Sequence, residues 1–363
     1  MTAIRVGMVG VGNISGQYLK TFQRLAGVEL VAVADLDRDR AQKVADDQGV
    51  RNLTVDELIN DDQVDLVLNL TIPAAHAEVA LAAIAAGKHV YGEKPLAATR
   101  ADGIKIIESA RAAGVQVGCA PDTVLGTGTQ TARAVLDAGE IGDPIAATAT
   151  MVTPGHERWH PNPDFYYQPG GGPLLDMGPY YVSSLITMLG PVARVIAAAS
   201  HTRDSRTIGS GPRAGETIDV SVDSHVTGVL VHESGVLSTL VMSFDAAASK
   251  ASNIEVHGTA ASMIVPDPNR FDGDVQVHPV GGEWETVPVR AGYRDGGRGI
   301  GVADLAATAD GALPRANGEL ALHALDVMLS LLQAAEEERS IDVATSCQRP
   351  PAVPLGDPAG GFV

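Results

Sequence analysis

The chain of 363 residues has little cysteine, no long apolar run and fewer basic than acidic side chains. Its two cysteines, Cys119 and Cys347, lie far apart without CxxC spacing, which argues against a disulfide framework, a zinc site or a redox dithiol. No apolar run approaches the roughly 20 residues that a membrane-spanning helix needs. The first residues pass directly into a strand-like segment without a signal-peptide pattern. We therefore expect a cytoplasmic protein with no membrane partner.

Basic side chains are in deficit, with 26 Lys and Arg against 44 Asp and Glu and a formal net charge of −18. That charge repels a phosphate backbone, so nucleic acid is not an expected partner. No set of His, Asp and Glu has convincing metal-ligand spacing, so we expect no metal site. The 45% of apolar and 19% of charged residues are typical of a globular chain, and the length suits two domains.

The first 120 residues alternate short apolar runs with amphipathic stretches, which predicts successive βαβ units and a doubly wound parallel sheet. Thr54 stands three residues before Glu57, a capping box for a short helix, and Thr99 is placed to cap a helix that runs to Ala113. Residues 1–120 are therefore predicted to form an α/β domain with strands at 4–9, 29–34, 66–70, 89–91 and 116–119.

Residues 121–350 have a different pattern, with a helix near 128–138, alternating segments at 220–231 and 236–244, and a late amphipathic helix at 320–337. The alternation indicates antiparallel strands, so this part is predicted to be an α+β domain. Residues 351–363 are rich in proline and glycine and are predicted to be an irregular tail.

A glycine motif follows the first predicted strand and opens the first helix, reading Gly10-Val11-Gly12-Asn13-Ile14-Ser15. Its glycines allow a tight turn and close approach of a pyrophosphate at the helix N-terminus, so residues 10, 12, 13 and 14 are expected to bind a dinucleotide. Asp35 ends the second strand, where a carboxylate accepts hydrogen bonds from ribose hydroxyls and repels a 2′-phosphate. This favours NAD over NADP, although Arg38 lies nearby and could pair with that phosphate. The alternative for Asp35 is a turn residue or a helix cap.

Together with four further motifs, the glycine turn resembles the glucose-fructose oxidoreductase and inositol dehydrogenase family, called Gfo/Idh/MocA. The other motifs are the segments 71–76 (Thr71-Ile72-Pro73-Ala74-Ala75-His76), 87–90, Glu93-Lys94-Pro95 and 170–180. The resemblance implies a Rossmann domain followed by a domain with a large, mainly antiparallel open sheet, and a homodimer or homotetramer. It also implies that Thr71, Pro73 and Glu93 line the nicotinamide ribose, that Lys94 meets the substrate, and that the Lys94–Pro95 peptide is cis. His76 lies near the cofactor loop and is either a cofactor residue or a residue that only caps or packs.

Lys94, Asp176 and Tyr180 are the expected catalytic residues. Lys94 lies just beyond the carboxyl end of a predicted parallel strand, where an ammonium can stabilise a developing alkoxide. Asp176 and Tyr180 lie four residues apart, so a helix would project both from one face. The resemblance is to the branch with tyrosine at position 180, and a phenol beside Lys94 would have a lowered pKa suited to a general acid or base. Lys94 is the electrostatic partner or alternative base, and Asp176 orients it or accepts a substrate hydroxyl. The alternatives are Asp176 as a helix cap and Tyr180 as a core aromatic.

Six of the fourteen aromatic residues lie between positions 159 and 181, which suits a pocket that packs the apolar faces of a sugar or cyclitol. Trp159, His160 and Tyr167 are expected to bind substrate there, whereas His156 is interpreted as an exposed loop histidine. Asp122, after the fifth strand, is expected near the substrate and favours a neutral polyol over a sugar acid. His323 in the late helix is either a further ligand or a structural hydrogen-bonding residue.

These residues favour an NAD-dependent dehydrogenase, with NADP as a possible alternative cofactor, acting on a secondary hydroxyl of a sugar, glycoside or polyol. A second hypothesis is an enzyme that keeps NAD bound and recycles it, giving net glycoside cleavage or epimerisation. A third is a non-catalytic regulatory protein that senses the nucleotide. The retained Lys94, Asp176 and Tyr180 speak against the third, because a sensor needs no proton relay.

Overall fold

A computed structural model describes residues 3–308 and 312–356, which fold into two compact units. Among the described residues, the first unit combines 3–130 with 290–308, 312–322 and 350–356, and the second combines 131–289 with 323–349. The predicted boundary at residue 120 divided the chain into two contiguous parts, whereas the observed units are not contiguous. The chain leaves the first unit inside the helix α6 (Thr127–Asp137), and it passes from the first unit to the second again inside the helix α9 (Gly318–Glu336). The returning segment belongs to the first unit because its helix α8 (Ile300–Ala306) places Val302 and Leu305 in the core of that unit.

The first unit contains a six-stranded sheet in the order β3-β2-β1-β4-β5-β6, with all neighbours parallel. The order reverses between β1 and β4, which confirms the predicted doubly wound Rossmann sheet. The strand β3, a two-residue edge strand, was not predicted. The strands are β1 (Ile4–Val9), β2 (Val28–Ala34), β3 (Arg51–Asn52), β4 (Leu66–Asn69), β5 (His89–Gly92) and β6 (Val117–Cys119).

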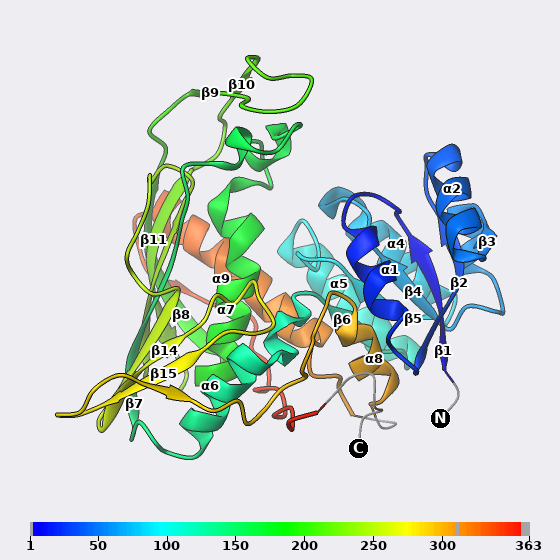
Figure 1. The fold of residues 1–363 in the computed structure, drawn as a ribbon. Helices are drawn as coiled ribbons and strands as arrows, with labels where there is room; N and C mark the ends of the chain where they lie inside the picture. The colour runs from blue at the N-terminus through cyan, green and yellow to red at the C-terminus, as the bar shows by residue number, and fades with distance from the viewer. Residues whose placement is uncertain (1–2, 309–311, 357–363) are drawn as a thin grey trace. The chain divides into compact units, whose positions relative to one another are not determined.

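Helices cover both faces of this sheet (Figure 1). The helices α1 (Ser15–Phe22), α2 (Arg38–Gln48) and α8 share one core, whereas α4 (Pro73–Ala85) and α5 (Arg100–Ala113) pack together on the other face. The capping box of Thr54 and Glu57 begins the short helix α3 (Val55–Ile59), as predicted. Thr99 caps α5 by accepting a hydrogen bond from the Asp102 N–H, also as predicted.

The second unit contains a nine-stranded sheet in the order β16-β15-β14-β13-β7-β12-β11-β8-β17. Only β7 and β12 pair in parallel, so the expected mainly antiparallel sheet is confirmed. The helix α7 (Gly172–Leu189) and α9 lie along one face (Figure 1). The strands are β7 (Pro144–Val152), β8 (Val192–Ser200), β11 (His225–His232), β12 (Leu237–Ser243), β13 (Ile254–Gly258), β14 (Ala261–Val265), β15 (Val275–Pro279), β16 (Glu285–Val287) and β17 (Ile341–Asp342).

The strand predicted at 220–231 is shorter than expected, because β11 begins only at His225 and residues 220–224 form a loop. A separate hairpin forms from β9 (Ser205–Thr207) and β10 (Thr217–Asp219). Close packing of α7 on α9 depends on Gly178, where a Cβ atom would lie 2.8 Å from the sulfur of Met328. Three short 3-10 turns, η1 (Asp122–Leu125), η2 (His156–Arg158) and η3 (Asp164–Tyr166), complete the elements that matter for the site.

The predicted irregular tail is only partly described. Up to residue 356 it lies against the first unit, where Val353 is fully buried and its carbonyl accepts a hydrogen bond of 3.0 Å from the Gly292 N–H. Residues 357–363 lie outside the described residues. None of the helices within 3–308 and 312–356 combines the length and the hydropathy that a membrane span requires.

Candidate active site

The glycine turn lies at the switch point of the parallel sheet, after β1 and beside the loop that follows β4. Gly10 has a φ of +93°, and a Cβ atom there would lie 2.7 Å from the Leu70 carbonyl oxygen, so only glycine fits. Nothing lies within 4 Å of the Cβ position of Gly12, which leaves room for a ligand to approach its backbone. The Ser15 hydroxyl donates 2.7 Å to the Gly12 carbonyl and closes the turn. Asn13 is exposed and Ile14 is half-buried at its tip.

Asp35 braces the glycine turn from the end of β2. Its carboxylate accepts hydrogen bonds from the N–H of Val11 at 2.8 Å and from the N–H of Asp37 at 2.9 Å. It also forms an ion pair of 2.8 Å with Arg40. Burial raises the pKa of Asp35, but these hydrogen bonds outweigh burial and hold the pKa below its ordinary value. Arg38, expected to supply the charge near Asp35, instead donates to the Leu53 carbonyl, and Arg40 takes its place.

Two large aliphatic side chains are exposed on the loops that flank the glycine turn. Leu36, directly after Asp35, is 94% exposed, and Ile72, at the start of α4, is 70% exposed. A planar ring that enters the open space at Gly12 can cover exposed apolar side chains of this kind. Neither residue was predicted as a site residue, since a single aliphatic residue in a loop has no periodic pattern.

His76 ties together the loops that follow β4 and β5. Its ring is 2% exposed, with Nδ1 2.7 Å from the Pro95 carbonyl and Nε2 3.1 Å from the Thr71 carbonyl. Asn69 completes the clamp, because its side chain donates to the His76 carbonyl and accepts from the Thr71 hydroxyl at 2.6 Å. Burial lowers the pKa of His76. The ring therefore positions the loops around Thr71 and Pro73 rather than projecting from them.

Glu93 and Lys94 follow β5 directly, and the Lys94–Pro95 peptide is cis, as the resemblance implied. The Glu93 carboxylate is held by two donors, the Tyr18 hydroxyl at 2.8 Å and the Lys94 N–H at 3.1 Å. Tyr18 is fully buried in α1, 75 residues away in the chain, and was not predicted as a site residue. Burial raises the pKa of Tyr18 well above its usual value, so the phenol stays a donor to Glu93. Lys94 is half-buried.

Asp122 does not occupy the open position expected of a substrate ligand. It is fully buried in η1, where one carboxylate oxygen accepts hydrogen bonds from the N–H groups of Gly299 at 2.7 Å and Gly301 at 3.2 Å. Arg298 approaches the other oxygen at 3.8 Å. Burial raises the pKa of Asp122 to about 6. Asp122 therefore anchors the segment that leads into α8, and the structure supports a structural role.

In the second unit, Asp176 and Tyr180 lie one turn apart on α7, as predicted. A carboxylate oxygen of Asp176 lies 3.1 Å from Nε2 of His156, which is only 9% exposed. The interpretation of His156 as an exposed loop histidine is therefore wrong. Because a carboxylate only accepts hydrogen bonds, Nε2 carries the proton. The other ring nitrogen, Nδ1, is buried and has no hydrogen-bond partner within residues 3–308 and 312–356. Tyr180 is 7% exposed.

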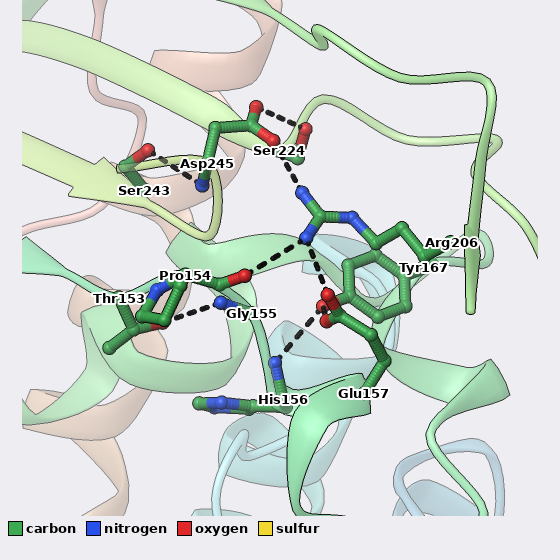
Figure 2. A network of polar contacts seen from close by, with 10 residues as sticks. All are labelled: Thr153, Pro154, Gly155, His156, Glu157, Tyr167, Arg206, Ser224, Ser243 and Asp245. Atoms are coloured by element: carbon green, nitrogen blue, oxygen red, sulfur yellow. Dashed lines mark hydrogen bonds and ion pairs between the residues drawn. The ribbon is translucent and has the colours of Figure 1, made fainter. Parts of the chain in front are cut away.

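A buried ionic network holds the loop that carries His156 (Figure 2). Arg206 in β9 contacts Glu157 at 3.0 Å and the Pro154 carbonyl at 3.3 Å, and its other terminal nitrogen pairs with Asp245. The Tyr167 hydroxyl donates to Glu157 and accepts a hydrogen bond of 3.1 Å from the His156 N–H. Tyr167, expected to bind substrate, is fully buried and fixes the backbone of His156 instead.

The other residues expected to bind substrate differ in how far their side chains are exposed. Trp159 is 58% exposed and His160 is half-buried beside it, so both remain accessible to a ligand. Burial lowers the pKa of His160. His323 is fully buried, with Nε2 accepting from the Val192 N–H at 2.9 Å and Nδ1 3.1 Å from the Thr345 hydroxyl. Burial lowers the pKa of His323 to about 4, which agrees with the structural alternative for this residue.

The loops of the first unit fit a dinucleotide, and the donor set gives no sign of a metal. Open space above Gly12, the Asp35 carboxylate and the exposed Leu36 and Ile72 supply a pyrophosphate approach, a ribose acceptor and an apolar surface. Within the described parts of the chain, no three His, Cys, Asp or Glu side chains gather in a way that could hold a metal ion.

Comparison with known proteins identifies the family. Residues 4–120 match the oxidoreductase family with an NAD-binding Rossmann fold, and residues 129–264 match the GFO/IDH/MocA C-terminal domain. The chain is 31% identical over 265 residues to a 1,5-anhydro-D-fructose reductase of Ensifer adhaerens, covering 72% of this chain and 75% of that protein. The chain belongs to the Gfo/Idh/MocA family of oxidoreductases.

Other relatives agree with this assignment. Inositol 2-dehydrogenase 3 of Saccharopolyspora erythraea is 40% identical over 156 residues, which span 42% of this chain and 46% of that protein. An NAD binding oxidoreductase from Klebsiella pneumoniae has a similar structure, with a TM-score of 0.82, 25% identity and coverage of 95% of this chain and 100% of that one. Levoglucosan dehydrogenase, at 21% identity and a TM-score of 0.80 over 96% of this chain and 100% of that one, shares the fold.

Proposed function

We propose that this oxidoreductase is an NAD-dependent dehydrogenase that oxidises a secondary hydroxyl of a sugar, glycoside or polyol. The observation that carries the proposal is the pairing of Asp176 with buried His156, one helical turn from Tyr180, in a chain whose other unit carries a braced glycine turn and the Glu93–Lys94 pair. Relatives named for anhydrofructose and inositol support a carbohydrate or cyclitol substrate.

The chain's own residues would divide the chemistry as follows. The Lys94 ammonium donates a hydrogen bond to the reacting hydroxyl and stabilises its oxygen as negative charge develops. Tyr180, in its phenolate form, takes up the hydroxyl proton at its oxygen and so becomes a phenol, which returns the proton in the reverse direction. Asp176, held by His156, accepts a hydrogen bond from a neighbouring hydroxyl and sets the orientation of the ring. Bound NAD supplies the hydride acceptor.

The first test is turnover on a panel of sugars and polyols with NAD, followed by the absorbance of released NADH. Lys94→Ala and Tyr180→Phe should lower kcat by about a hundredfold or more, since positioned proton transfer contributes roughly 10²–10⁴-fold. Both should still bind NAD in calorimetry. Lys105→Ala, on the exposed face of α5, and Tyr181→Phe, whose hydroxyl bonds Asn253, are the matched controls. Formation of product without release of free NADH would instead favour an enzyme that recycles bound NAD. A protein that binds NAD but turns over no sugar or polyol would overturn the proposal of a dehydrogenase.

Asp35 makes NAD the preferred cofactor in this proposal, because its carboxylate would lie where a 2′-phosphate must enter. Asp35→Ser should raise the ratio of kcat/KM for NADP over that for NAD, since it removes the repelling charge and releases Arg40 from its ion pair. Adding Arg40→Ala should cancel that gain, because a guanidinium is the group that would bind the phosphate. A ratio unchanged by Asp35→Ser would contradict the assignment.

The proposal includes assembly into a homodimer or homotetramer. The subunits would meet through the face of the nine-stranded sheet that α7 and α9 leave uncovered. Ile196 of β8 and Leu237 of β12 are 49% and 48% exposed there. Ile196 pairs with Val229, which pairs with Thr239, so this row spans three neighbouring strands. Ile196→Asp should lower the mass found by sedimentation to that of a monomer, and an unchanged mass would refute this interface.

A further inference from the structure

A continuous row of aromatic rings runs from the Asp176–His156 pair to the surface of the second unit. The His156 ring lies 5.1 Å from the Trp159 ring and 4.7 Å from the Tyr166 ring, measured between centroids. His160 lies 5.4 Å from Tyr166 and 5.5 Å from Phe165. Exposure rises along the row, from 9% at His156 to 58% at Trp159 and 56% at Phe165.

The backbone that carries these rings is held in place. The Ser210 hydroxyl donates 2.7 Å to the Trp159 carbonyl, and the Gly209 N–H donates 2.7 Å to the Glu157 carbonyl. The carboxylate of Asp164, next to Phe165, accepts hydrogen bonds from both terminal nitrogens of Arg213, at 2.6 and 3.0 Å. Two large aromatic side chains are thus partly exposed to solvent on a segment held by hydrogen bonds, so a ligand that covers them need not order the segment first.

The chemistry of the surface favours a carbohydrate ring over a protein partner. A sugar packs its apolar C–H face on an aromatic ring while its hydroxyls reach polar groups at the edge, and His160 is such a group here, with its ring 5.4 Å from the Trp159 ring and 5.5 Å from the Phe165 ring. A protein hot spot instead buries its anchor in a dry pocket, which here would also desolvate the partly exposed Asp164–Arg213 ion pair next to Phe165.

We propose that Trp159 and Phe165 form a second carbohydrate subsite, so that the preferred substrate is a disaccharide or longer glycoside, with its reacting ring at the Asp176–His156 pair and its next ring on Trp159 and Phe165. This inference rests on the proposed dehydrogenase function. It identifies two residues that determine substrate length without taking part in hydride transfer.

The test compares glucose with cellobiose and maltose on the holoenzyme, together with calorimetric titration of cellobiose, which needs no turnover. Trp159→Ala and Phe165→Ala should each lower kcat/KM for the disaccharides about five- to tenfold more than for glucose, since loss of one stacking contact of up to about 1.5 kcal/mol corresponds to that factor. Trp159→Phe should restore most of the preference. The matched control is Trp284→Ala, because Trp284 is also exposed, at 42%, and packs edge to face against the His278 ring.

The outcomes separate this inference from the proposed function. Equal losses for glucose and disaccharides, or a wild-type enzyme that oxidises glucose as well as cellobiose, would overturn the second subsite and leave the dehydrogenase intact. Absence of turnover with any sugar would overturn the dehydrogenase, and calorimetry would then decide the subsite by whether Trp159→Ala weakens cellobiose binding. A change in sedimentation of Trp159→Ala would show that a second copy of the chain covers these rings, which also overturns the proposal.

Discussion

Replacement of Arg206 by methionine tests the buried ionic network that holds His156. The Arg206 side chain is 1% exposed, and the carboxylates of Glu157 and Asp245 are 5% and 8% exposed. Methionine keeps much of the volume but leaves two buried carboxylates without their shared cation. Removing one partner of a buried ion pair costs about 3–5 kcal/mol. That is a large part of the roughly 5–15 kcal/mol that stabilises a typical domain.

The loss should depend on pH, and its sign can be worked out. In the native protein burial raises the pKa of Asp245, but hydrogen bonds from Ser224 and Thr202 and the charge of Arg206 outweigh it, so the pKa lies below its ordinary value. Without Arg206 the folded-state pKa rises. The variant then carries its full penalty above that raised pKa and recovers stability as the pH falls toward the pKa of the unfolded chain. The difference from wild type should therefore shrink from pH 8 to pH 5.

Tryptophan fluorescence during urea unfolding measures the loss of stability in the second unit, which contains Arg206. The chain has two tryptophans, Trp159 and Trp284, and both lie in the unit that contains Arg206. The matched control is Arg213→Met, which breaks ion pairs with Asp164 and Glu216 at the surface and should leave the urea midpoint unchanged. The reasoning is refuted if Arg206→Met is as mild as the control, or if its loss is the same at pH 5 and pH 8.

Two further predictions concern the first unit. Because burial raises the pKa of Asp122 from 3.8 to about 6, the wild type should lose roughly 3 kcal/mol of stability as pH rises from 4 to 6, at 1.36 kcal/mol per pKa unit. Asp122→Asn should lack that slope in thermal unfolding followed by circular dichroism, and parallel pH curves would count against it. His76→Ala should weaken NAD binding about tenfold in calorimetry but leave ADP-ribose binding intact, since the loops it clamps are those expected at the nicotinamide; equal losses would contradict this.

Short-range features were predictable from the sequence because they depend on a few neighbouring residues. The glycine turn, the caps at Thr54 and Thr99 and the strand period placed most of the parallel sheet within one or two residues of its observed limits. The i, i+4 spacing likewise placed Asp176 and Tyr180 on one helical face. In each case the backbone geometry of one element, or the hydrogen bonding of one turn, selects the residue type.

Partners distant in sequence were not predictable in the same way. Tyr18 reaches Glu93 across 75 residues, and Arg206 in β9 joins Glu157 in η2 to Asp245, which follows β12. Polar residue type gave no warning of these contacts, because a tyrosine or arginine in an amphipathic segment is equally compatible with solvent. The ion pair between Asp35 and Arg40, formed while Arg38 donates to the Leu53 carbonyl, likewise depends on side-chain geometry that the sequence does not show.

The sequence by itself determined the class of this protein. Each of the features that indicate the class depends on a few neighbouring residues: the glycine turn, the acidic residue that ends the second strand, and the Glu93-Lys94-Pro95 motif. Tertiary structure alone decided which polar residues are open to a ligand: His156 was paired with Asp176, whereas Asp122, Tyr167 and His323 were taken into the interior. The physical reason is burial, because the same imidazole or carboxylate becomes a ligand group or a structural brace according to which backbone donors surround it when the chain closes.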